Sequence, residues 1–552
     1  MKLKITICLA LLLVIISGCA SFSTTAKMVD AVTGMPKGTH GNPWWNDTVF
    51  YEIFVRSFYD SNGDGVGDFN GITEKLDYLN DGNPNTHNDL GVTGIWLMPI
   101  NPSPSYHGYD VTDYFKVNPD YGTMDDFKNL LKEAHKRGIR VIIDMVLNHT
   151  SDENPWFTNS WEPTSPYHTW YIWEKDKPVT VGPWGEKVWF PSHGEFYFGI
   201  FGSNMPDLNY NNPVVTQEMD KVVQFWITEV GVDGFRLDAV KHLIEEDSNM
   251  QNTPETHTWL QQLRSVYKTA NPKAMTIGEV AGENPLVLAS YTKGDQLDLT
   301  FEFNMASAFV KSAKEGNAGT ALEQMRISYK LIPNMQFAPF LTNHDQDRLM
   351  SQLNNDPNKV KVAASMLLTS PGVPFIYYGE EIGMEGQKPD EAIRKPMQWS
   401  GEKAGGFSKN FPWESVGADY LIYNVENESP ETTSILAHYK ALIQIRNEHA
   451  ALRIGDVAFT HSDNPGLYSI MRITSNEAML VVINLTKDAI SDYNLSLDKS
   501  GLARGNYKLL AVMGTGPFVN LDVNPMGGFT GYQPLGEIPA YSTLIMQLRP
   551  GQ

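Results

Sequence analysis

The sequence contains very little cysteine. Only two cysteines occur in 552 residues, Cys8 and Cys19, and both lie within the first twenty positions. Cys8 lies inside the apolar run from Ile5 to Ile16, so we expect no disulfide in the mature fold. Stability must then come from a large core, for which the apolar fraction of 41% is sufficient, and from bound metal.

Basic residues are also scarce. The chain has 43 Lys and Arg residues against 64 Asp and Glu residues, which gives a formal net charge of −21. A nucleic-acid partner would require a basic patch, so we expect no nucleic-acid ligand. The charge is compatible with a neutral substrate and with bound cations.

Long apolar runs are missing after residue 16, and no later segment is apolar for long enough to cross a membrane. The early run follows Lys2 and Lys4, as in a secretory signal. It ends in Ile16-Ser17-Gly18-Cys19, which resembles a bacterial lipoprotein cleavage box.

These features predict a signal peptide over residues 1–18, lipidation of Cys19 and a polar tether over residues 19–43. The alternative is a plain signal peptide that happens to contain Cys19. We therefore expect an exported protein of a bacterial cell envelope that is anchored to the membrane by its N-terminal lipid.

Eight short apolar runs alternate with helical patterns after the tether. Continuous apolar runs of this length are typical of parallel strands that are covered on both faces. The clearest helix is Asp125–Arg137, which begins with acidic residues and ends with basic ones before Gly138. The alternation predicts an α/β fold, a (β/α)8 TIM barrel. The candidate strands are Val49–Phe54, Thr93–Pro99, Arg140–Val146, Gly234–Ala239, Met275–Val280, Leu299–Asn304, Ala338–Asn343 and Pro374–Gly379.

Two further regions do not follow this alternation. Residues 148–212 are dense in Trp, Tyr, Pro and Gly and show no helix pattern, which predicts a small irregular domain inserted after the third strand. The barrel then comprises residues 44–147 and 213–448. Residues 449–552 contain short runs separated by turns and predict an antiparallel β-sandwich. These runs are Val457–Thr460, Leu467–Arg472, Ala478–Asn484, Tyr507–Val512 and Ser542–Leu548.

Three of the barrel strands are followed or ended by a carboxylate: Asp238, Glu279 and Asp345. Acidic residues are uncommon in buried strands, so each needs a reason. One such residue could be a cap or half of a salt bridge. Three in succession predict carboxylates gathered at the C-terminal end of the barrel, where this fold builds active sites.

The segments around these carboxylates resemble the α-amylase family, glycoside hydrolase family 13. Three further segments extend the resemblance, which runs from about Trp44 to the C-terminus. Met205–Asn209 is intermediate between the oligo-1,6-glucosidase and neopullulanase branches, so the subfamily stays open. The resemblance implies a retaining glycoside hydrolase that acts on an α-glucan polysaccharide or oligosaccharide, and we expect a monomer. The additional segments are Asp144–His149, Met205–Asn209 and Gly372–Glu381.

The resemblance also implies roles for the carboxylates. Asp238 would be the nucleophile, Glu279 the acid/base and Asp345 a third carboxylate that grips sugar hydroxyls. Retaining hydrolysis needs the first two carboxyl groups roughly 5 Å apart. Arg236 lies on the same strand face as Asp238 and would keep it ionised, whereas burial or nearby negative charge should raise the pKa of Glu279.

Five more residues are implied as sugar contacts in addition to Arg236. Tyr109 would stack on the sugar ring, because an aromatic face suits the apolar face of a pyranose. His149 and His344 would donate hydrogen bonds to the same sugar, and Lys241 and His242 would contact the leaving-group side. A core tyrosine and satisfied core or rim histidines are the alternative interpretations.

The residue after the nucleophile is Ala239, where oligo-1,6-glucosidase relatives commonly have valine. The smaller side chain favours α-1,4 cleavage, although steric effects of this kind are worth only about 1–3 kcal/mol. A 4-α-glucanotransferase, an oligo-1,6-glucosidase or neopullulanase type of enzyme and a non-catalytic starch-binding relative remain as alternatives. Aromatic residues between positions 156 and 201 could add sugar platforms, but most are expected in the core of the inserted domain.

The segment Asp60–Asp68 places oxygen-bearing residues at alternate positions. Such spacing wraps a loop around a hard cation, so we expect structural Ca²⁺ here rather than a catalytic metal. Gly71 stands where an EF-hand has glutamate, which excludes that motif, and an Asx/Gly turn is the alternative. The expected ligands are Asp60, Asn62, Asp64, Asp68 and the carbonyl group of Val66.

A second Ca²⁺ site is implied by the resemblance alone. Its ligands would be Asn148, Asp207 and the backbone carbonyl of His242. This ion would fix the inserted domain to the barrel.

Overall fold

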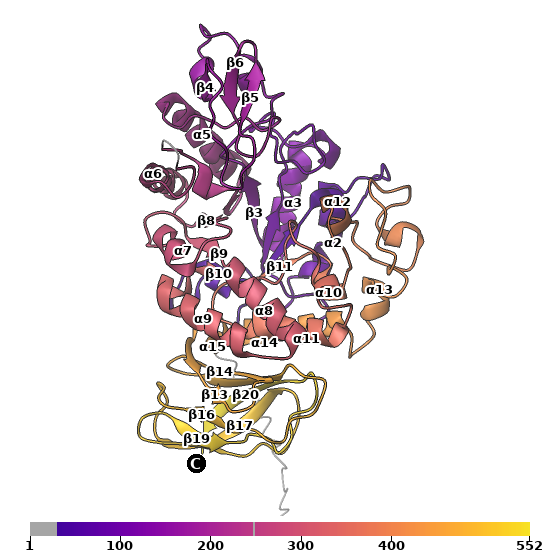
Figure 1. The fold of residues 1–552 in the computed structure, drawn as a ribbon. Coiled ribbons are helices and arrows are strands. Elements are labelled where there is room, and N and C mark those ends of the chain that lie inside the picture. The colour runs from indigo at the N-terminus through magenta and orange to yellow at the C-terminus, as the bar shows by residue number, and fades with distance from the viewer. Residues whose placement is uncertain (1–29, 247–248, 552) are drawn as a thin grey trace, which may run out of the picture.

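The computed structural model describes residues 30–246 and 249–551 (Figure 1). The predicted signal peptide and Cys19 lie outside the described residues. Eight parallel strands form the central sheet in the order β10-β9-β8-β7-β3-β2-β1-β11. The amide of Phe375 donates to the carbonyl of Pro339 at 3.0 Å and joins the two ends of this sheet into a barrel. The strands are β1 (Phe50–Ile53), β2 (Gly94–Leu97), β3 (Arg140–Met145), β7 (Gly234–Leu237), β8 (Met275–Gly278), β9 (Leu299–Phe301), β10 (Phe337–Ala338) and β11 (Phe375–Tyr377).

The predicted TIM barrel is confirmed, but several strand ends are shorter than predicted. Strand β9 ends at Phe301 because the carboxylate of Glu302 accepts the amide of Met305 and caps the next helix. Strand β10 ends at Ala338, and the residues as far as Asp345 form a loop at the end of the barrel.

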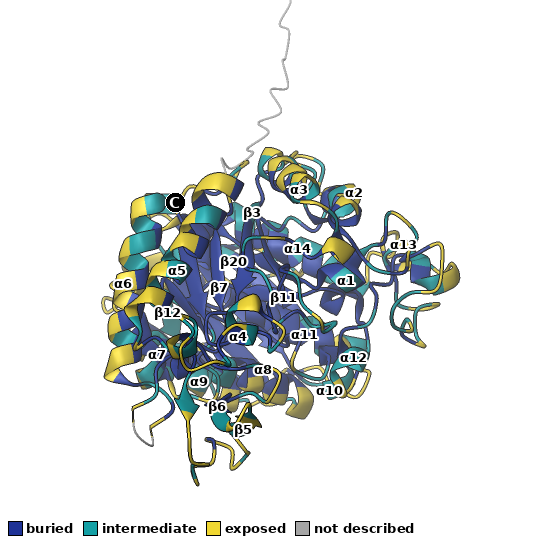
Figure 2. Cartoon of the chain, turned by 90° about the horizontal axis from the view of Figure 1, so that it is seen from above, coloured by how far each residue is buried: buried dark blue, intermediate teal, exposed yellow. Residues whose placement is uncertain are grey.

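Helices surround the barrel, with buried inner faces and exposed outer faces (Figure 2). Helix α3 confirms the predicted helix with a shift of one residue at each end. Thr123 and Asp126 form a capping box that fixes its start. The helices of the barrel are α1 (Val55–Phe58), α2 (Phe69–Leu79), α3 (Met124–Lys136), α5 (Pro213–Gln224), α6 (Pro254–Ala270), α7 (Pro285–Tyr291), α8 (Phe303–Glu315), α9 (Gly319–Leu331), α10 (Leu349–Gln352), α11 (Pro357–Thr369), α12 (Asp390–Ile393), α13 (Val425–Glu428), α14 (Ile435–Glu448) and α15 (Ala450–Ile454).

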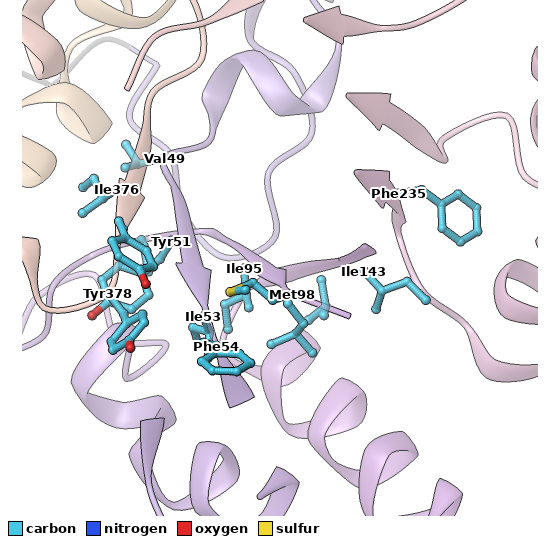
Figure 3. Close-up of a cluster of buried hydrophobic side chains, with 14 of the residues drawn as sticks. Val49, Tyr51, Ile53, Phe54, Ile95, Met98, Ile143, Phe235, Ile376 and Tyr378 are labelled. Carbon is cyan, nitrogen blue, oxygen red and sulfur yellow. The ribbon is translucent and has the colours of Figure 1, made fainter. Parts of the chain in front are cut away.

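Alternate residues of each barrel strand face opposite sides. Tyr51 and Ile143 belong to the large cluster between strands and helices, part of which Figure 3 shows, whereas Phe50 and Ile142 belong to a separate cluster inside the barrel. Two residues beyond Ile142, the same alternation brings Asp144 to the inner side. Polar side chains therefore replace apolar ones at the C-terminal end of the barrel interior.

The inserted domain projects from the C-terminal end of the barrel (Figure 1, top). Its short strands form an antiparallel sheet in the order β4-β6-β5, and its only α-helix within the described residues is the single turn α4 (Pro155–Thr158). A backbone bridge between His149 and Asp207 ties its two ends together. The strands are β4 (Trp173–Glu174), β5 (Trp189–Ser192) and β6 (Glu195–Phe198).

The C-terminal region forms two antiparallel sheets packed around a core of their own, which confirms the predicted sandwich. One sheet has the order β12-β14-β15-β20-β17-β18 and the other β13-β16-β19. This domain lies at the end of the barrel away from the inserted domain (Figure 1). Its strands are β12 (Asp456–Phe459), β13 (His461–Ser462), β14 (Leu467–Ile473), β15 (Ala478–Asn484), β16 (Leu495–Leu497), β17 (Gly505–Met513), β18 (Leu521–Val523), β19 (Phe529–Tyr532) and β20 (Thr543–Pro550).

Residues 30–43, which we expected to belong to a tether, contact the body of the protein. The amide of Val32 donates to the carbonyl of Asn447 at 2.9 Å, and Arg453 donates to the hydroxyl of Thr39 at 3.1 Å. The described part of this segment is therefore fixed. No helix in the described part of the chain is both long and apolar enough to cross a membrane.

Candidate active site

One buried guanidinium organises the site. Arg236 lies on β7 with 1% of its side chain exposed, facing the barrel interior. Its Nη1 donates to Asp238 Oδ1 at 2.6 Å and to Asp144 Oδ1 at 2.9 Å, and its Nη2 donates to Glu279 Oε2 at 2.6 Å. Because β3 and β7 pair with Asp144 opposite Arg236, the sheet register itself creates part of this cluster.

The nucleophile and acid/base candidates have raised pKa values. Burial raises the pKa of Asp238 to about 6, with attraction by Arg236 opposing it and repulsion by Asp144 adding to it. Asp238 is therefore largely ionised at neutral pH. Burial also raises the pKa of Glu279, against the attraction of Arg236 and with repulsion by Asp238. The amide of Ala239 donates to Glu279 Oε2 at 3.3 Å and helps to fix that carboxyl group.

The third carboxylate has a different environment. Asp345 is exposed, and Arg394 Nη2 donates to its Oδ1 at 2.8 Å while His344 Nε2 lies 3.2 Å from its Oδ2. Partial desolvation within the cavity opposes ionisation, but the charges of His344 and Arg394 outweigh it and lower the pKa of Asp345. Asp345 is thus held as an anion facing the cavity, which suits hydrogen bonding to sugar hydroxyl groups.

His344 and Tyr109 form a stacked pair with ring centroids 5.6 Å apart. The Nδ1 atom of His344 lies 2.6 Å from Glu52 Oε1, and its Nε2 lies 2.7 Å from the Tyr109 hydroxyl. Burial lowers the pKa of His344, but Asp345 and Glu52 more than compensate, so that the pKa is raised overall. Tyr109 reaches the cavity, whereas His344 lies behind it with 1% of its side chain exposed.

A cavity of about 690 Å³ opens above these groups. Of the residues predicted as catalytic or sugar-contacting, all but Arg236 and His344 line it, so Arg236 acts on the carboxyl groups rather than on the sugar. Burial lowers the pKa values of His149 and His242 to about 4, so both are neutral at pH 7. The predicted residues that line the cavity are Tyr109, His149, Asp238, Lys241, His242, Glu279 and Asp345.

This arrangement contains the pair of carboxyl groups that double-displacement glycoside hydrolysis uses. Two carboxyl groups share one cation, one is ionised at neutral pH, and the other has a raised pKa suited to proton donation. A third carboxylate faces the same cavity.

Comparison with known proteins decides the family. A family model of the α-amylase catalytic domain matches residues 52–455. The chain belongs to the α-amylase family. It is therefore a glycoside hydrolase of family 13, as the sequence segments predicted.

Relatives within the α-amylase family differ in specificity. Alpha-amylase 3 of Dictyoglomus thermophilum is 38% identical over 495 residues, covering 86% of this chain and 94% of the relative. An oligo-1,6-glucosidase of Parageobacillus thermoglucosidasius is 32% identical, covering 80% of this chain and 91% of the relative. The crystal structure of an α-amylase from H. orenii matches with a TM-score of 0.79 and 40% identity, covering 91% of this chain and 99% of the other.

The oxygen-rich loop Asp60–Asp68 has donor atoms that suit Ca²⁺, but its side chains are engaged with the loop itself. Asp60 accepts the amides of Gly63 and Gly65, and Asp68 accepts that of Ser61. These are the hydrogen bonds of an Asx/Gly turn, the alternative interpretation. Within residues 30–246 and 249–551, no three His, Cys, Asp or Glu side chains are grouped as a metal site.

The second predicted Ca²⁺ site shows a clearer fit. Asn148 and Asp207 lie side by side, with Asn148 Nδ2 donating to Asp207 Oδ2 at 3.0 Å. Asn148 Oδ1 is buried without a hydrogen-bond partner, and so is Oε1 of Glu245, whose charge acts on Asp207. Unpartnered buried oxygen atoms beside a buried aspartate suit a hard cation.

Several site residues were not predicted. Glu52 and Asp144 could have been found from strand alternation, because both fall on predicted strands at inward positions. Arg394 lies beyond β11 in a segment without a periodic pattern, and neither its spacing nor a motif indicates its pairing with Asp345. Asp390, on α12, accepts from the same guanidinium at 3.1 Å.

Proposed function

We propose that this protein is an α-amylase in the strict sense, a retaining hydrolase of α-1,4-glucosidic bonds in starch, glycogen and maltodextrins. One observation carries the proposal: Arg236 donates hydrogen bonds to both Asp238 and Glu279. Both carboxyl groups line one cavity, together with Asp345. The neutral, hydroxyl-rich substrate agrees with a cavity that offers carboxylates and neutral histidines.

In the first step, an oxygen of Asp238 attacks the anomeric carbon while Glu279 protonates the glycosidic oxygen, and the bond to the leaving sugar breaks. In the second step, Glu279 takes a proton from water, which attacks the anomeric carbon and releases Asp238. Two inversions give retention of configuration. Asp345 and Arg394 lie where they can bind hydroxyl groups of the reacting sugar.

Ala239 supports α-1,4 rather than α-1,6 specificity. It lines the cavity between the nucleophile and Lys241, and its methyl group leaves more room for a leaving sugar than a valine would. The same residues would serve a glucanotransferase, in which a second sugar replaces water. The oligo-1,6-glucosidase relatives make α-1,6 cleavage the other outcome to be tested.

A product time course on maltoheptaose, with isomaltose and panose alongside, tests the proposal. We expect short maltooligosaccharides released as α-anomers, with the α-1,6 bonds of isomaltose and panose left intact. Products longer than seven units would indicate a transferase, and rapid cleavage of isomaltose would contradict the reading of Ala239. Glu279→Gln should lose hydrolysis while keeping starch binding.

We also propose that Ca²⁺ stabilises the cleft at two places. Asn148, Asp207 and the carbonyl of His242 would hold one ion between the inserted domain and the barrel, and the loop Asp60–Asp68 would hold another. Bound Ca²⁺ supplies positive charge to buried oxygen atoms and fixes loops; the bond-breaking steps use this chain's carboxyl groups.

Export and lipid anchoring at Cys19 form a separate proposal, which rests on the sequence of residues 2–19. Labelled palmitate should enter the wild-type protein in a bacterial host and should not enter Cys19→Ser. Equal labelling of both proteins would exclude Cys19 as the modified residue.

A further inference from the structure

Trp184 differs from most aromatic residues of the inserted domain. Its side chain is 61% exposed, whereas Trp170 and Tyr197 are 8% and 6% exposed and belong to the domain core. Trp184 also lines the catalytic cavity. An indole ring exposed at the mouth of a binding cavity invites a functional explanation, because so large an apolar surface is normally covered.

The backbone around Trp184 is fixed. Its amide donates to Glu186 Oε2 at 2.8 Å, and the amide of Gly185 donates to the carbonyl of Gly182 at 3.0 Å. Gly185 has φ +84°, a left-handed conformation that suits glycine. A backbone bridge between Val181 and Lys187 closes this turn.

The ring of Trp184 has two aromatic neighbours, His242 and Phe201. Its centroid lies 5.5 Å from the ring of His242 and 6.0 Å from that of Phe201. His242 is fixed in turn, because its Nδ1 lies 2.8 Å from the carbonyl oxygen of Met250. These contacts orient the indole and leave the rest of it open to the cavity.

The position of Trp184 identifies the side of the cleft that it serves. A general acid must face the leaving-group oxygen, so the leaving sugar lies on the side of Glu279. Lys241 Nζ donates to the carbonyl of Ala281, just after Glu279, at 2.7 Å, and Trp184 packs on the next residue, His242. Arg394, which holds Asp345, comes from the segment after β11, and β11 stands opposite β7 in the ring of strands. Trp184 and Arg394 therefore contact elements on opposite sides of the barrel.

We propose that Trp184 is a stacking platform for a glucose unit on the leaving-group side of the scissile bond. The inference rests on the proposed function and adds to it a substrate class, namely α-glucans that extend beyond the bond that is cleaved. The apolar face of a pyranose would lie on the indole, and loss of such a contact should lower kcat/KM about threefold to tenfold.

Two substrates separate this role from a structural one. Maltoheptaose can place sugars on both sides of the bond, whereas α-maltosyl fluoride has a leaving group that is too small to reach Trp184. We expect Trp184→Ala to lower kcat/KM about threefold to tenfold on maltoheptaose and to leave hydrolysis of the fluoride within twofold of wild type. Trp184→Phe should recover most of the loss. Val179→Ala is the matched control, because Val179 is 98% exposed in the same segment and does not line the cavity.

Equal losses on both substrates, or no loss on either, would overturn the role of Trp184. Failure of the proposed function has a different signature, in which the wild-type protein cleaves the fluoride but not maltoheptaose. In that case the same comparison is made with whichever of isomaltose, panose or trehalose the wild type cleaves. If Trp184→Ala leaves the ratio of kcat/KM on that substrate to kcat/KM on the fluoride unchanged, the stacking role is again overturned. Wild-type inactivity on every substrate would overturn both proposals.

Discussion

Replacing Arg236 with alanine removes the cation shared by the two carboxyl groups to which we assign catalytic roles. The variant leaves Asp144, Asp238 and Glu279 together without their common partner. Breaking one buried ion pair costs about 3–5 kcal/mol of stability, so we expect a lower melting temperature as well as lower activity.

The magnitude of the activity change follows from the pKa of Asp238. With Arg236 present, this pKa is about 6. A hydrogen bond to a charged group is worth about 1.5–3 kcal/mol, and 1.36 kcal/mol corresponds to one pH unit, so the acid limb of kcat/KM should move upward by about one to two pH units. At pH 7 most of the nucleophile would then be protonated. Loss of orientation should reduce the rate further, also at high pH.

The assay is a pH profile of kcat/KM on maltoheptaose for wild type, Arg236→Ala and Arg236→Lys, with folding checked by circular dichroism. Lysine keeps the charge but cannot bind two carboxyl groups through a planar fork, so it should shift the acid limb less while still losing rate. Arg264→Ala is the matched control. Arg264 forms an ion pair with Asp298, with Nη1 2.9 Å from Oδ1, and neither residue lines the cavity. A folded Arg236→Ala enzyme with wild-type kcat/KM and an unchanged acid limb would contradict the role assigned to Arg236.

Three further predictions can be measured with the same protein. In the wild type, kcat/KM should fall as the pH falls through about 6, because Asp238 becomes protonated; a flat profile between pH 5 and 7 would contradict this. Asp144→Asn removes a carboxylate whose charge raises the pKa of Asp238. In the same pH titration, the acid limb of this variant should therefore move to lower pH, opposite to the shift in Arg236→Ala. Added Ca²⁺ should raise the melting temperature of chelator-treated protein, because a ligand at 100 times its Kd adds about 2.7 kcal/mol to the free energy of unfolding. Asp207→Ala should lose more of this stabilisation than Asp64→Asn. A melting temperature that ignores both Ca²⁺ and chelator would exclude the metal proposal.

The barrel could be predicted from sequence because its signal is local. Each strand is a short apolar run bounded by turn or helix signals, and the resulting order of elements admits few topologies. The predicted C-terminal ends of β9 and β10 were wrong for a physical reason. Phe303 and Phe340 are apolar and continue the strand pattern, but Glu302 caps a helix and the residues after Ala338 turn into the cleft. Apolarity alone cannot distinguish a strand from the apolar loop that follows it.

The site was predictable where each residue belongs to a recognisable segment and unpredictable where it depends on pairing between distant elements. Asp238, Glu279 and Asp345 follow from their segments. Arg394 reaches Asp345 from a loop 49 positions later, and this contact depends on the path of the chain after β11. Trp184 was one of several aromatic residues in the inserted domain, and only its exposure sets it apart.

The charges of the site fall into two separately balanced groups. Asp345 has its own partners in Arg394 and His344 and is held as an anion by them. Arg236 must serve three carboxyl groups, of which Asp144 is fully buried. One cation cannot compensate the charges of three carboxylates, so the group around Arg236 retains a proton at a pH where an isolated carboxyl group would have lost it. Asp144 is sealed from the cavity, whereas 20% of the Glu279 side chain is exposed. The retained proton can therefore leave the group through Glu279, whose pKa is raised by burial and by the charge of Asp238.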